Sequence, residues 1–83
     1  MVNLPIEVIT WIDATGGDGW ITKKEFEATN LTEFDTVGYV FSEDEKCVKL
    51  TMAYDEETDH IGAYMVIPKG MIIKRNRIIW QIY

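Results

Sequence analysis

Histidine and cysteine are almost missing from this chain, which contains a single histidine, His60, and a single cysteine, Cys47. A lone cysteine cannot form an internal disulfide, which agrees with a reducing compartment. One residue of each kind also provides no cluster of cysteine and histidine ligands for a metal. As a nucleophile and base the two are poorly placed, because Cys47 alternates with the apolar side of a predicted strand and His60 ends a turn. We therefore expect neither an enzyme nor a bound cofactor.

Long apolar runs are missing as well. No stretch approaches the roughly 20 apolar residues that a membrane helix requires, and the first residues lack the basic segment and apolar run of a secretion signal. The glycine-rich residues 16–19 lack the Lys-Ser/Thr ending of a P-loop and the spacing of a dinucleotide fingerprint. The sequence thus predicts a cytoplasmic protein without membrane contact.

Positive charge is scarce, with eight lysines and arginines against fourteen acidic residues, a net charge of -6 and a pI near 4.6. Such a chain repels a phosphate backbone, which disfavours general nucleic-acid binding and makes a basic protein surface the more natural target. Hydrophobic residues make up 47% of the 83 residues and aromatic residues 12%, which is enough to build one core. We expect a single domain over residues 1–83.

The first elements follow from local patterns. Residues 6–12 are rich in β-branched and aromatic side chains and predict a strand. Thr22 and Glu25 form a Thr-x-x-Glu capping box, which predicts a short helix over residues 23–28.

Beyond the helix, apolar and polar residues alternate with a period near two, which is typical of antiparallel strands with one buried face. A second strand has Val37, Tyr39 and Phe41 on its buried face. A third strand runs through residues 48–54 and likewise shares one face among Val48, Leu50, Met52 and Tyr54. Residues 61–67 predict a fourth strand that Pro68 ends, and residues 71–83 a fifth. The predicted fold is mainly β, a small five-stranded antiparallel curled sheet or barrel with one short helix after the first strand.

Residues 13–25 look like the second half of an EF-hand calcium loop. With Gly19 at the sixth position, Asp18 and Glu25 occupy ligand positions. The first half departs from that pattern, since Ala14 and Gly16 offer no side-chain oxygen and Asp13 fits only a longer loop. Turns at positive φ through Gly16, Gly17 and Gly19, together with a helix cap, explain the same residues without metal. No metal site is therefore favoured, and the candidate ligands are Asp13, Asp18 and Glu25.

Two charged zones and an apolar tail provide the candidate binding residues. Seven acidic residues between positions 43 and 59 lie on predicted turns at neighbouring corners and could imitate nucleic-acid phosphates toward a partner: Glu43, Asp44, Glu45, Asp55, Glu56, Glu57 and Asp59. Acidic turns also keep a small domain soluble and discourage edge pairing, which is the commoner reason for such a cluster. A basic zone near the last strand is the alternative nucleic-acid contact set: Lys69, Lys74, Arg75 and Arg77. The tail from residue 78 is apolar on both faces, which predicts burial or self-association through Ile78, Trp80 and Ile82.

Several short motifs resemble a group of small tailed-phage and prophage proteins: Trp11-Ile12-Asp13, Gly19-Trp20, Glu25, Val37-Gly38-Tyr39-Val40, Glu43 and residues 67–72. That group looks like a compact Sm-like or Src-homology-like β-barrel family. The resemblance implies a phage origin and a host bacterial cytoplasm, and it implies no catalytic residue. In this chain the tail beyond Ile73 is longer and more apolar than expected of the group.

The leading interpretation is a non-catalytic phage accessory protein that binds a host protein, such as a component of a defence system, through its acidic surface. Two alternatives remain: an oligomeric Sm-like ring that binds RNA or a nucleotide, and a calcium-binding module that uses the loop 13–25. We also expect the aromatic residues Trp11, Trp20 and Tyr39 to fill the core, with a ligand-stacking surface as the alternative.

Overall fold

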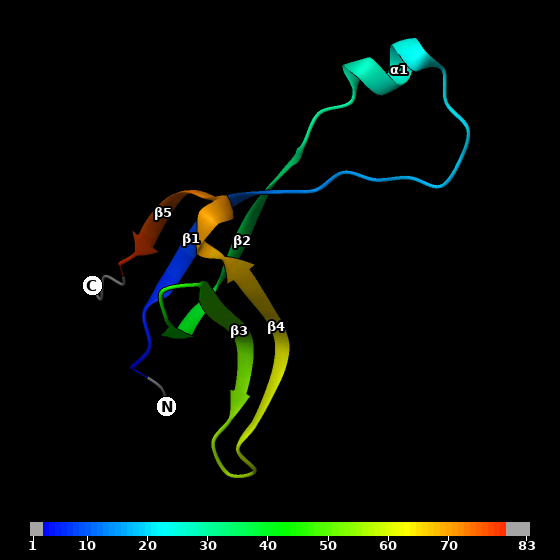
Figure 1. The fold of residues 1–83 in the computed structure, drawn as a ribbon. Coiled ribbons are helices and arrows are strands. Elements are labelled where there is room, and N and C mark those ends of the chain that lie inside the picture. The colour runs from blue at the N-terminus through cyan, green and yellow to red at the C-terminus, as the bar shows by residue number, and fades with distance from the viewer. Residues whose placement is uncertain (1–2, 80–83) are drawn as a thin grey trace.

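The computed structural model describes residues 3–79 and shows five strands, one short helix and one 3-10 turn (Figure 1). The strands are β1 (Ile6–Asp13), β2 (Thr32–Glu43), β3 (Cys47–Asp55), β4 (His60–Pro68) and β5 (Ile72–Ile78). Helix α1 (Lys23–Ala28) lies between β1 and β2, and the 3-10 turn η1 (Lys69–Met71) joins β4 to β5. The predicted succession along the chain, a strand, a short helix and four further strands, is confirmed.

The five strands form one antiparallel sheet in the order β4-β3-β2-β1-β5. The sheet curls, since Ile67 at the end of β4 joins the same apolar cluster as Ile9 of the distant strand β1. Within the described residues β4 and β5 remain its two edges, so the curled sheet does not close into a barrel. Lys69 of η1 extends the β3–β4 pairing by one residue, because its backbone N–H donates to the carbonyl of Lys46 at 2.8 Å.

The core lies where the curled sheet folds over itself, and it is small. Its buried apolar side chains are Ile9, Trp11, Val40, Val48, Leu50 and Ile67, with Ile72 packed against them. Trp11 packs on Phe34 with ring centroids 5.3 Å apart and donates its indole N–H to the hydroxyl of Thr36 at 2.9 Å.

Two expectations about the buried faces are wrong. In β2 the buried apolar side chain is Val40, whereas Val37 and Phe41 of the expected face are exposed. In β3 Val48 and Leu50 are buried as expected, but Met52 is exposed. Met52 is exposed because the distal half of the β3–β4 hairpin extends beyond the curl, and no second layer among the described residues covers it (Figure 1).

Residues 14–31, including α1, project from the ends of β1 and β2 as an arm that lies apart from the sheet (Figure 1). Every residue of this arm is exposed. The radius of gyration is 16.7 Å, whereas a compact domain of this length has a radius of about 12 Å. Trp20 lies on the arm and is fully exposed, so the expectation that it fills the core is wrong, while Trp11 does belong to the core.

The backbone geometry of the arm combines a capped short helix with an open loop. Thr22 caps α1 by accepting the N–H of Glu25 at 3.1 Å, as the capping box predicts. None of the described glycines has a positive φ, so the expected left-handed turns at Gly16, Gly17 and Gly19 are absent. This segment therefore runs as an open excursion between two paired strands rather than as a tight turn.

Candidate interaction surfaces

Four charged side chains form one connected network beside the core. Arg75 of β5 donates to both carboxylate oxygens of Glu7 on β1, with Nε–Oε1 2.7 Å and Nη2–Oε2 3.1 Å. The same guanidinium donates to Glu43 at the end of β2, and Lys69 of η1 pairs with that carboxylate at 3.1 Å. Glu7 is buried, and its pairing with a planar guanidinium satisfies a charge that would otherwise be costly there.

Hydrogen bonds from Arg75, and then from Lys69, lower the pKa of Glu43 to about 2. Hydrogen bonds to Glu43 and Glu7 raise the pKa of Arg75 in turn. Glu43, predicted as a partner contact, and Lys69 and Arg75, predicted as nucleic-acid contacts, therefore bind one another. Their shared function in the fold is to hold β5 and η1 against β1 and β2.

The acidic turns lie at opposite ends of β3, not at neighbouring corners as the sequence suggested. Asp44 and Glu45 precede Cys47, whereas Glu56 and Glu57 follow Asp55. At roughly 3.3 Å per residue the two turns are about 25 Å apart. They form two separate acidic tips.

Two of these carboxylates stabilise their own turns by accepting backbone N–H groups. Asp44 accepts the N–H groups of Lys46 and Cys47, and those bonds lower its pKa. Asp55 accepts the hydroxyl of Thr58 and the N–H of Glu57, which lowers its pKa as well.

Asp59 accepts the hydroxyl of Tyr54 at 3.0 Å. That hydrogen bond raises the pKa of Tyr54. The carboxylates of Glu45, Glu56 and Glu57, the other members of the predicted partner set, are exposed and accept no hydrogen bond from residues 3–79.

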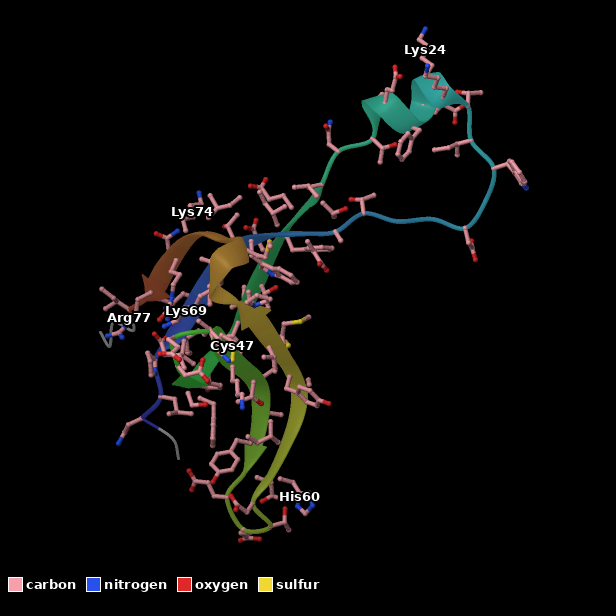
Figure 2. The ribbon with its side chains drawn as sticks, viewed as in Figure 1. Lys24, Cys47, His60, Lys69, Lys74 and Arg77 are labelled. Atoms are coloured by element: carbon pink, nitrogen blue, oxygen red, sulfur yellow. The ribbon has the colours of Figure 1, made fainter. Side chains whose placement is uncertain are left out.

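The basic zone is not one patch. Lys69 and Arg75 are engaged with Glu43 and Glu7. On β5, Lys74 lies opposite Thr10 and Arg77 opposite Glu7, and side chains three positions apart on a strand point to opposite faces. Figure 2 shows Lys74 and Arg77 projecting in different directions.

The three candidate calcium ligands are spread along the arm and its root. Asp13 ends β1 and accepts the N–H of Ala14 at 2.8 Å, whereas Glu25 belongs to α1. Over residues 3–79 no group of three His, Cys, Asp or Glu side chains comes together as a metal site. Cys47 and His60 begin adjacent strands of one hairpin and lie at its opposite ends, as Figure 2 shows.

The arm exposes large apolar side chains, which makes it the first candidate interaction surface: Trp20, Ile21, Phe26 and Leu31. The arm also surrounds an open hollow of about 470 Å³, lined by Ile21, Phe26 and the small residues beside them. A six-residue helix is far shorter than the roughly 12 to 15 residues at which isolated helices become marginally stable. The arm thus exposes apolar side chains to water and does not pack them against the core of the sheet.

The β3–β4 hairpin is the second candidate surface. β4 is an edge strand, and its side chains from His60 to Val66 are exposed. A hollow of about 380 Å³ lies on this hairpin and is mostly apolar, with Phe41, Leu50, Ile61, Tyr64, Met65 and Val66 in its lining. A second hollow of about 200 Å³ adds Val37 and Met52.

Sequence reasoning missed both surfaces, because alternating apolar residues were assigned to a core. The available signal was the predicted helix over residues 23–28, which is too short to pack Phe26 firmly against a sheet. Of the predicted self-association residues, Ile78 ends β5 and is exposed, while Trp80 and Ile82 lie outside the described residues.

No protein-family model matches the chain, and neither the curated proteins nor the solved structures contain a significant match to it. The phage relationship therefore stays a prediction. None of the helices in residues 3–79 is long and apolar enough to cross a bilayer.

Proposed function

We propose that this protein is a non-catalytic binding protein that attaches to a protein partner through its arm. The observation that carries the proposal is the exposure of residues 14–31, whose large apolar side chains contact no core in the single chain. Aromatic side chains such as Trp20 and Phe26 are the typical anchors of protein interfaces, where each buries roughly 150 to 250 Å². A partner surface would remove this area from water.

Two further observations support binding over catalysis and over RNA contact. Cys47 and His60 lie at opposite ends of one hairpin, so this thiol has no access to this imidazole as a base. Lys69 and Arg75 are already paired with carboxylates, and Lys74 and Arg77 lie on opposite faces of β5. The predicted phage origin would supply a host protein as one class of partner.

A photo-reactive amino acid placed at Trp20 tests the proposal in the bacterial cells that produce the protein. We expect discrete cross-linked species on illumination, and their loss when Phe26→Ser is added. The matched control carries the same amino acid at Lys74, an exposed position of β5 away from the arm. A protein that remains a bare single chain after illumination at position 20 would overturn the proposal.

The acidic surface expected from the sequence is tested separately. The cleanest variant is Glu45→Lys with Glu56→Lys and Glu57→Lys, because Glu43 and Asp44 hold the network and a turn, and their loss would alter the fold. Loss of the cross-link in this variant assigns binding to the acidic turns as well as to the arm. An unchanged cross-link removes the acidic turns from the binding surface.

A further inference from the structure

We infer that Asp18 is a modification site, at which the chain converts spontaneously to isoaspartate. The arm holds the dipeptide Asp18-Gly19 outside any strand or helix, and both residues are exposed. A glycine after an aspartate favours this reaction, because no side chain of its own hinders attack by its amide nitrogen. The inference goes beyond the proposed function and does not depend on the partner that the arm binds.

Hydrogen bonding separates Asp18 from the other five aspartates of the chain. Over residues 3–79, neither the carboxylate of Asp18 nor the amide N–H of Gly19 takes part in a hydrogen bond. Asp18 is also the one aspartate that a glycine follows. The remaining aspartates each accept at least one hydrogen bond that holds the carboxylate in place: Asp13, Asp35, Asp44, Asp55 and Asp59.

The space around Asp18 permits the reaction as well. A Cβ added at Gly17 or at Gly19 would meet no atom within 4 Å, so nothing packs against the backbone on either side of Asp18. The carboxyl carbon can therefore turn toward the nitrogen of Gly19 without displacing a neighbour. Asp35 shows the opposite case, because it lies in β2 and is paired with Thr10 of β1, where strand pairing prevents that rotation of the backbone.

The reaction needs only the chain and water. The amide nitrogen of Gly19 attacks Cγ of Asp18, and the carboxyl hydroxyl group leaves with the amide proton as one water molecule. The product is a five-membered succinimide ring. Water then opens the ring at one of its two carbonyl carbons. Attack at Cγ restores aspartate, whereas attack at the main-chain carbonyl carbon leaves the chain running through Cβ and Cγ, which is isoaspartate.

The modification changes the arm and spares the sheet. Isoaspartate adds one carbon atom to the main chain and attaches the carboxylate to Cα, while the net charge is unchanged. Trp20 follows two positions later and is fully exposed. The strands lie outside residues 14–31, so their pairing does not depend on the backbone path at Asp18. A second form of the arm therefore accumulates as the protein ages.

Incubation of the purified full chain at neutral pH and physiological temperature tests the inference. Methyl transfer from labelled S-adenosylmethionine by a protein-isoaspartate methyltransferase counts the product, and peptide mapping by mass spectrometry locates it. We expect isoaspartate at position 18 to form roughly tenfold faster than at any other aspartate, preceded by a species lighter by one water molecule. Isoaspartate that is absent from position 18, or that forms as fast at another aspartate, would overturn the inference.

Two variants of the arm check the chemistry. Gly19→Ala places a methyl group beside the attacking nitrogen and should slow the reaction several-fold. Asp18→Glu should abolish the product at this position, because a glutamate would have to close a less favourable six-membered ring. Both positions are exposed and without close neighbours, so both variants should keep the fold. An unchanged rate in Gly19→Ala would contradict attack by this amide.

Glu45→Gly is the matched control for the effect of structure, because it places a glycine after Asp44. The carboxylate of Asp44 accepts the N–H groups of Lys46 and Cys47 at 2.8 and 2.9 Å. We therefore expect much slower reaction at position 44 than at position 18 in this variant. Equal rates would overturn the structural basis of the inference. The proposed function is decided separately, since its readout is the cross-link formed at position 20.

Discussion

Arg75 binds Glu7 through two nearly parallel hydrogen bonds that join β5 to β1 across 68 positions of the sequence. This geometry depends on the planar fork of a guanidinium, and a lysine ammonium cannot reproduce it. Replacement by lysine should therefore cost about 1 to 3 kcal/mol in the free energy of unfolding. The midpoint of urea denaturation measures the loss.

The matched control for Arg75→Lys is Arg77→Lys on the same strand. Arg77 lies opposite Glu7 in the register, is exposed, and has no ion pair in the structure over residues 3–79. We expect its stability to stay within about 0.5 kcal/mol of the wild type. Equal losses in the two variants would show that the paired geometry contributes nothing.

The lowered pKa of Glu43 predicts a dependence of stability on pH. In the unfolded chain this carboxyl takes up a proton near its usual pKa of about 4.3, whereas in the folded chain it stays ionised down to about pH 2. The unfolded state therefore binds more protons between these values, and stability falls as the pH decreases through that window. Above it, the contribution of Glu43 is fully present.

Denaturation of wild type and Glu43→Gln at several pH values from 7 to 2.5 measures this contribution. The variant should be less stable at pH 7 and should lose less stability on acidification, so that the two curves converge at low pH. Glu27→Gln on the exposed helix α1 serves as the control. Parallel curves for wild type and Glu43→Gln would contradict the predicted role.

Gly38 and Gly17 should respond in opposite ways to alanine. A Cβ added at Gly38 would lie 3.0 Å from the backbone carbonyl oxygen of Thr51 in the neighbouring strand, and backbone atoms yield little. We expect Gly38→Ala to destabilise the protein by about 1 to 3 kcal/mol.

At Gly17 no atom lies within 4 Å of the added Cβ, and φ is not positive. Gly17→Ala should therefore be neutral or stabilise by up to about 1 kcal/mol, because alanine restricts the unfolded chain. Thermal unfolding of both variants checks the pair. A loss at Gly17 comparable to that at Gly38 would mean that the arm requires a conformation or contact that the single chain does not show.

Calcium at millimolar concentration should give no binding heat and no shift of the melting temperature. The physical reason is that Asp13, Asp18 and Glu25 come from the end of β1, the open loop and α1, and do not converge. Calcium requires six to eight oxygen ligands around one point. A saturable heat, or a shift that a chelator reverses, would restore the calcium-binding alternative.

Local patterns in the sequence were sufficient for the strands and for the helix. β-branched residues and the residues that end a strand located β1, β3 and β4 to within one or two residues, and Thr22 with Glu25 located α1. These features depend on neighbours in the chain, so the sequence contains them directly. The pairing of strands and the number of layers depend on residues far apart.

The charge network could not be predicted from local sequence patterns, because its members are far apart in the chain. Glu7, Glu43 and Arg75 were assigned to no site, to an acidic site and to a basic site, and the curl of the sheet brings them into one cluster. Which apolar side chains are buried could not be predicted from local patterns either. Val37, Met52 and Trp20 match a core pattern, yet a single curled sheet without a second layer covers only the side chains inside its curl.

The tertiary structure thus decided which apolar residues remain exposed, and with them the surfaces available for binding. An alternating strand has the same sequence pattern whether its apolar face meets its own core or a partner, because both environments exclude water. The sequence specified the strands, the helix and the acidic charge through local chemistry. The arrangement of those elements in space left the arm and the β3–β4 hairpin uncovered.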